Sequence, residues 1–222
     1  MIIELIEAVK KRDLENVKLL LDKGYSVDEQ NEKNETALHF AAKKGDAETA
    51  KLLLEKGASV DVKNNDNETA LHCAAMYGYT KIVELLLEKG ASVDVQNKNN
   101  ETALHCAAKR GDTETAKLLL EKGASVDVKN NDNETALHCA ANRGDKETAK
   151  LLLEHGADIE EKDNSGRTPL YMASINIHKQ HIQVIEFLLE RGAKIEEKDS
   201  TGCTALHYAE KNRHNDIVKA IS

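Results

Sequence analysis

The sequence is poor in aromatic residues. Phe, Trp and Tyr make up 3% of 222 residues, with no Trp, two Phe and five Tyr. A core of this protein must therefore be built from aliphatic side chains, because too few aromatic rings are present to fill one. Two aromatic residues that stand close together in such a sequence, as Tyr77 and Tyr79 do, need an explanation of their own.

Proline and cysteine are also scarce, with one Pro and four Cys. The cysteines do not show the paired spacing of a zinc site or of a disulfide framework. Free thiols persist in reducing compartments. The cysteine pattern therefore predicts a cytoplasmic protein without structural metal.

Long apolar runs and an excess of positive charge are absent. No apolar stretch approaches the roughly 20 residues of a membrane-spanning helix, and residues 1–10 carry charges that a secretory leader would lack. The formal net charge is -8, from 31 Lys and Arg against 39 Asp and Glu. Nonspecific binding to nucleic acid or to an anionic membrane is disfavoured by this charge. We expect neither as a partner.

What the sequence does contain is a repeat. The phrase Thr-Ala-Leu-His and close variants of it occur six times, and the first five copies begin 33 residues apart. The sixth begins 36 residues after the fifth, which indicates a three-residue insertion. The copies start at Thr36, Thr69, Thr102, Thr135, Thr168 and Thr204. A fixed period of this length predicts a stack of similar units, each in contact with its neighbours alone.

The order of motifs within one period resembles the ankyrin-repeat family. The third unit has a Thr-x-Leu-His phrase, an Ala pair, a Gly, a Leu triplet and a Gly-Ala pair. These are Thr69-Ala70-Leu71-His72, Ala74-Ala75, Gly78, Leu85-Leu86-Leu87 and Gly90-Ala91. Ala replaces the family's Pro in every copy except the one with Pro169. The resemblance implies an all-α ankyrin-repeat solenoid of about seven units, with paired antiparallel helices and projecting β-hairpin-like loops.

Local residue preferences predict where these helices begin and end. Asn67 stands at a turn position that needs a positive φ, and Thr69 is a good N-cap for the first helix of the unit. Gly78 and Gly90 are expected to end the first and second helices. Asp46 and its equivalents, Asp112 and Asp145, are expected to cap the second helices of their units.

The period divides the chain into a single domain of seven units. An N-terminal cap unit at 1–33 is followed by regular repeats at 34–66, 67–99, 100–132 and 133–165. Residues 166–201 form a repeat with an insertion around Ile177-His178-Lys179. We expect a longer turn there, and the alternative is a loop on the binding face, where insertions in repeat arrays often lie. The C-terminal unit, 202–222, lacks the final Leu pair and Gly. It is either a short cap or the point where a longer protein was cut.

Residue types that could carry chemistry are mostly explained by the repeat. The recurring histidines are expected to bind the turn backbone and the capping Thr, because units stacked about 8–10 Å apart cannot share a zinc ion at about 2 Å. They are His39, His72, His105, His138 and His207. A pair such as His178 and His181 lacks a third ligand. We expect no catalytic, cofactor-binding or metal-binding residues, and no enzyme activity.

Three of the cysteines share one repeat position with apolar residues. Cys73, Cys106 and Cys139 stand where other units have Phe40, Met172 and Tyr208. Their place in the repeat predicts small buried side chains. Cys203 occupies a loop position and is expected to be the thiol that reacts most readily.

A partner site is predicted where near-identical repeats differ. The third unit has Met76, Tyr77 and Tyr79 at positions that are charged in the second and fourth units. In ankyrin-like stacks this edge lines the concave groove, and Tyr and Arg are common in binding hot spots. The alternative is that these are ordinary solvated residues. The predicted site is Lys43, Lys44, Met76, Tyr77, Tyr79, Lys109, Arg110, Asn142 and Arg143.

These observations predict a noncatalytic protein–protein interaction scaffold. It would bind a partner protein through the concave groove and the loop tips, and the partner would present an acidic segment with an apolar anchor. The polar end units favour a monomer. The alternatives are an ankyrin segment of a larger protein, a secreted bacterial effector in the host cytosol whose activity lies outside these residues, or a structural spacer.

Overall fold

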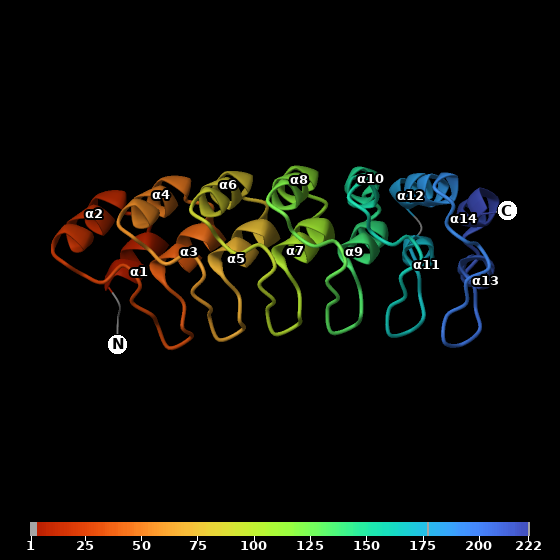
Figure 1. The fold of residues 1–222 in the computed structure, drawn as a ribbon, viewed down its shortest axis with the longest axis horizontal. Helices are drawn as coiled ribbons and strands as arrows, with labels where there is room; N and C mark the ends of the chain where they lie inside the picture. Colours follow the sequence, from red (N-terminus) through yellow and green to blue (C-terminus); the bar gives the residue numbers. More distant parts are fainter. Residues whose placement is uncertain (1–3, 177, 222) are drawn as a thin grey trace.

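The protein is described by a computed structural model that covers residues 4–176 and 178–221. Seven helix pairs stand side by side in two rows, and the connecting loops project beyond the row of first helices (Figure 1). The first helices are α1 (Glu4–Lys10), α3 (Ala37–Lys44), α5 (Ala70–Tyr77), α7 (Ala103–Arg110), α9 (Ala136–Arg143), α11 (Pro169–Ser174) and α13 (Ala205–Lys211). The second helices are α2 (Leu14–Asp22), α4 (Ala47–Glu55), α6 (Thr80–Glu88), α8 (Thr113–Glu121), α10 (Lys146–Glu154), α12 (Lys179–Glu190) and α14 (Asn215–Ile221).

Helix boundaries follow the predicted caps. Thr69 is the N-cap of α5, and Gly78 ends the helix in the left-handed region with φ 72°. Asn67 has φ 58° in the turn before that cap, a conformation that Asn adopts more easily than most residues. The Asp46 side chain accepts the backbone N–H of Thr49 at 3.1 Å and caps α4. Asp112 and Asp145 cap α8 and α10 in the same way.

The recurring histidines join each unit to the next. His72 is 1% exposed, and its Nδ1 accepts the backbone N–H of Thr69 at 3.2 Å. Because Nδ1 accepts, the ring proton is on Nε2, which donates to the Glu101 carbonyl oxygen at 3.1 Å in the following unit. The same bonds recur from His39, His105 and His138. The predicted structural role of these histidines is confirmed, and it extends to the neighbouring unit.

The loops are also joined to one another. Each loop donates one backbone N–H to a carbonyl of the loop before it, for example Lys98 N to Asp66 O at 2.9 Å. Within the described residues the loops are turns rather than strand hairpins, and one isolated β-bridge links Lys198 and Thr204.

The core follows the stack as a band of aliphatic side chains. Leu53, Leu86, Leu119 and Leu152 of four successive second helices are all 0% exposed. The Ala pairs of the first helices are also fully buried, and their small size lets neighbouring helices approach closely. None of the described helices has the length and apolar character that crossing a membrane requires.

Three of the four cysteines belong to this core. Cys73, Cys106 and Cys139 are 1%, 5% and 4% exposed. Burial raises the pKa of Cys73 and of Cys139 to about 12, and it raises the pKa of Cys106 as well. The prediction that they are small core residues is confirmed. Cys203 is half-buried, with its backbone N–H bound to Asp199.

Thiol labelling should separate these two groups. At about pH 8, iodoacetamide is expected to alkylate Cys203 first, because the thiolate is the reacting form and the buried thiols stay protonated. Mass spectrometry of the native protein should find one rapid modification, with the other three appearing only in denaturant. Rapid labelling of Cys106 in the native protein would contradict its buried position.

Candidate partner-binding site

The predicted site residues come from equivalent ends of successive first helices. Lys43 and Lys44 end α3, Met76 and Tyr77 end α5, Lys109 and Arg110 end α7, and Asn142 and Arg143 end α9. Tyr79 is the N-cap of α6. Since the units repeat regularly, these positions line one edge of the stack. Three shallow hollows lie along this edge from Met76 to Gln180, and all three include Arg143. We call this edge the inner groove.

An apolar patch lies at one end of the inner groove. Met76 is 39% exposed and Tyr77 is 44% exposed, which is high for large apolar side chains. The Tyr77 and Tyr79 rings stack with centroids 6.1 Å apart and an angle of 24° between their planes. Tyr79 itself is half-buried, and its ring lies so close to Gly45 that a Cβ there would be 2.5 Å from Cε1. Tyr79 therefore supports the patch, whereas Met76 and Tyr77 form its accessible surface.

Two of the lysines in the predicted site are neutralised by neighbouring glutamates. Lys43 Nζ donates to Glu35 Oε1 at 2.6 Å, and Lys109 pairs with Glu101 in the same way. Burial alone would raise the pKa of Glu35, but the hydrogen bonds from Lys43 and Asn31 outweigh it and lower the pKa. The basic character expected of this edge is therefore reduced at Lys43 and Lys109.

The positive charge that remains comes mainly from arginines. Within the described residues, Lys44, Arg110 and Arg143 form no ion pair. The Arg110 side chain lies across Gly78, where a Cβ would be 2.2 Å from its Nε. Arg143 Nε donates to the Arg110 carbonyl oxygen at 3.3 Å. Both side chains are thus packed against the preceding unit.

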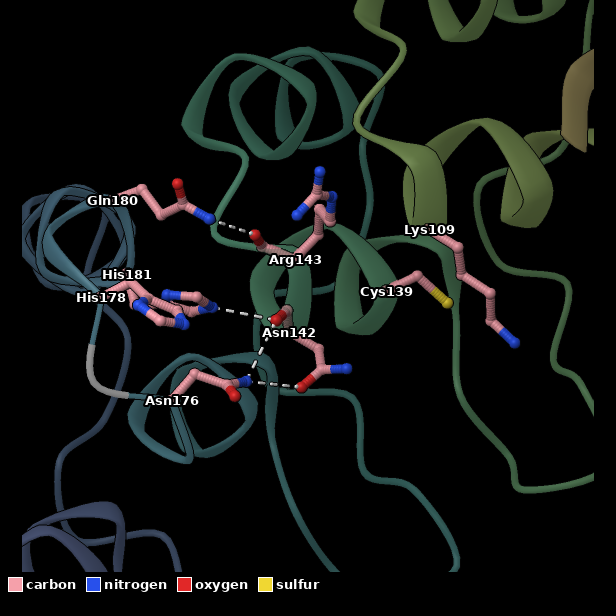
Figure 2. A pocket seen from close by; sticks show the side chains of 8 residues that line it. All are labelled: Lys109, Cys139, Asn142, Arg143, Asn176, His178, Gln180 and His181. Carbon is pink, nitrogen blue, oxygen red and sulfur yellow. Dashed lines mark hydrogen bonds between the residues drawn. The ribbon is translucent and has the colours of Figure 1, made fainter. Parts of the chain in front are cut away.

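The insertion forms the other end of the inner groove (Figure 2). Here α9 contributes Cys139, Asn142 and Arg143 to the wall of a hollow of about 290 Å³. His178, Gln180 and His181 line its opposite side, and Lys109 and Asn176 complete it. Gln180 Nε2 donates to the Arg143 carbonyl oxygen at 3.1 Å, and His181 Nε2 donates to that of Asn142 at 3.0 Å. Asn176 Nδ2 donates to Asn142 Oδ1 at 3.1 Å.

Sequence reasoning assigned the insertion to a longer turn and missed this hollow. Ile177, in the middle of the insertion, lies outside the described residues. The break in the period was the signal that could have indicated it. In the structure, His178 takes the place of the usual aspartate N-cap, and α12 is 12 residues long. The His178 and His181 rings lie 5.8 Å apart. Among the described residues, no cluster of three or more His, Cys, Asp or Glu side chains could hold a metal ion.

Comparisons with known proteins agree with the fold. The family model described as ankyrin repeats (3 copies) matches residues 5–97, 89–163, 124–199 and 160–222. The crystal structure of the human ASB11 ankyrin repeat domain is similar, with a TM-score of 0.86 and 28% sequence identity over 99% of this chain and 98% of that one. No curated protein sequence matches the chain.

The chain therefore belongs to the ankyrin-repeat family, and its fold is an α-solenoid of stacked helix pairs. Ankyrin repeats are in general protein–protein interaction modules, and the fold is typically a noncatalytic binding scaffold. Which surface binds, and what it binds, depends on the residues that differ among the repeats.

Proposed function

We propose that this protein is a noncatalytic scaffold that binds a partner protein along the inner groove. The observation that carries this proposal is the exposed pair Met76 and Tyr77 beside Arg110 and Arg143, which have no acidic partner among the described residues. Aromatic residues and Arg are enriched at binding hot spots, and an apolar patch with adjacent cations suits an acidic segment that carries an apolar anchor.

The stacking distance sets the spacing that such a segment needs. Units lie about 8–10 Å apart, and an extended chain advances about 3.3–3.6 Å per residue. An apolar side chain on Tyr77 would therefore place the third residue beyond it near Arg110 and the sixth near Arg143. The proposed ligand is an extended peptide with an apolar anchor and acidic residues about three and six positions away.

Selection from a peptide display library, followed by fluorescence anisotropy, tests this function. Selected peptides should share the anchor-and-acid spacing. The double variant Met76→Ala and Tyr77→Ala is expected to bind them at least about tenfold more weakly, since hot-spot truncations cost more than about 1.4 kcal/mol.

A matched control is available in the first unit. Leu19 and Tyr25 are 51% and 38% exposed, so changing both to Ala removes a similar exposed surface far from the inner groove. This control should bind like the parent protein, and both variants should keep its melting temperature. If the Met76 and Tyr77 double variant bound the selected peptides as tightly as the parent protein does, the proposed site would be refuted.

A further inference from the structure

A glutamate precedes the capping Thr in each of the four regular repeats. These residues are Glu35, Glu68, Glu101 and Glu134. In the second and fourth units, the lysine eight residues later binds this glutamate. Lys43 Nζ lies 2.6 Å from Glu35 Oε1, and Lys109 pairs with Glu101. Glu101 and Lys109 line a hollow of about 500 Å³ in the inner groove. The repeat position of these glutamates therefore belongs to the groove surface.

The third unit lacks the lysine that would bind its glutamate. Met76 stands eight residues after Glu68, and a thioether has no proton to donate. Glu68 Oε2 accepts Asn64 Nδ2 at 2.9 Å, whereas Oε1 has no hydrogen bond or ion pair with any of residues 4–176 and 178–221. Glu68 is also half-buried, while the paired Glu35 and Glu101 are each 8% exposed. Its carboxylate is thus accessible to a cation from another molecule.

The neighbouring cations are already engaged. Burial alone would lower the pKa of Lys43, but its hydrogen bond to Glu35 and the negative charges of Glu35 and Glu68 outweigh burial and raise the pKa. Glu68 therefore lies near enough to Lys43 to affect it, yet Lys43 Nζ is bound to Glu35. In the following unit, Lys109 is bound to Glu101. Two ammonium groups serve three carboxylates, and the excess negative charge lies in the third unit, beside the apolar patch.

A lysine side chain has the length that this arrangement requires. Lys43 reaches Glu35 from the position that Met76 occupies in the third unit. A lysine that lies beside Met76 can therefore reach Glu68 over the same separation. Met76 is 39% exposed, so its side chain offers an apolar surface to the methylene stem. Lys and Arg commonly pack their stems on apolar groups and keep the charged end in a polar environment.

We infer that Glu68 binds a Lys or Arg side chain of the partner, which supplies the cation that the third unit lacks. The stem packs on Met76, and the charged end bonds to Glu68 Oε1. The inference rests on the proposed function and adds a basic residue to the ligand. This residue stands within about two positions of the apolar anchor, because units about 8–10 Å apart and about 3.3–3.6 Å per extended residue keep it over the third unit.

A double-mutant cycle with a peptide selected on the groove tests this contact. The peptide is compared with a copy in which its basic residue is norleucine, which keeps an apolar stem and removes the charge. Fluorescence anisotropy at constant ionic strength measures both against the full chain and against Glu68→Gln, whose amide can still accept from Asn64. Glu68→Gln should weaken the basic peptide at least about fivefold and the norleucine peptide less than about twofold. Equal losses, or selected peptides without a basic residue near the anchor, would overturn the inference.

The fifth unit provides a matched control. Glu134 is followed eight residues later by Asn142 and accepts Asn130 Nδ2 at 2.9 Å, as Glu68 accepts Asn64, but no exposed Met or Tyr lies at the end of its helix. Glu134→Gln should leave the affinity unchanged, and both Gln variants should keep the melting temperature of the parent protein.

The same peptides separate this inference from the proposed function. If they lose affinity with Met76→Ala and Tyr77→Ala but not with Glu68→Gln, the contact with Glu68 is wrong and the proposed function stands. If the Met76 and Tyr77 double variant binds them normally, the proposed function fails and the inference fails with it.

Discussion

Acidification below about pH 6.5 is expected to destabilise this protein steeply. Burial lowers the pKa of His39, His72, His105 and His138 in the folded chain. Each ring must stay neutral there, because its Nδ1 accepts a backbone N–H. The unfolded chain keeps the ordinary histidine pKa near 6.5 and binds more protons, so the free energy of unfolding falls as the pH drops below that value.

The expected size of the effect follows from proton linkage. Each histidine contributes a slope of up to about 1.4 kcal/mol per pH unit between its unfolded and folded pKa, and the four together a slope of up to about 5 kcal/mol per pH unit. Urea unfolding at about pH 7.5, 6.5 and 5.5 measures this slope. His105→Gln serves as the comparison, since it should destabilise the protein at pH 7.5 but show a smaller slope. A stability that stays flat between pH 7.5 and 5.5 would mean that the histidines are not held neutral.

The second large effect is expected from a core leucine in the middle of the stack. Leu119 in α8 is 0% exposed, and Leu→Ala at such a site costs about 2–5 kcal/mol. The loss should be at the upper end of that range, because α8 lies between α6 and α10 and a cavity there weakens packing on both sides.

The neighbouring residue provides the control. Leu118 is half-buried, so Leu118→Ala removes the same atoms from a less enclosed position and should cost clearly less. Both variants are compared by urea unfolding followed by circular dichroism. Equal losses for the two leucines, or less than about 1 kcal/mol for Leu119→Ala, would contradict the packing described for the second helices.

The fold could be predicted from the sequence because its determinants are local and repeated. Thr69 at the N-cap, Asn67 at a positive φ and Gly78 at the helix end each specify backbone conformation within a few residues. The period then implies stacking. The bond from His72 to Glu101 could not be predicted in the same way, because the partner is 29 residues away and depends on how the units pack.

The candidate site could be predicted only in outline. The period correctly brings Tyr77, Arg110 and Arg143 to one edge. It does not reveal that Lys43 pairs with Glu35 eight residues earlier, nor that Tyr79 lies against Gly45 of the preceding unit. The hollow at His181 was not predictable, since the insertion interrupts the regularity on which the prediction depended. The residues that differ between repeats determine the chemistry of this surface. How their side chains are arranged depends on how neighbouring units pack.

A crystal structure of the protein with a peptide selected for binding would show directly whether the inner groove is the partner-binding surface. We expect an extended peptide across the ends of α5, α7 and α9. Its apolar anchor should contact Met76 and Tyr77, and a carboxylate should lie within about 4 Å of the Arg110 or Arg143 guanidinium. A peptide bound along the second helices, or one that leaves both arginines without contact, would contradict this expectation.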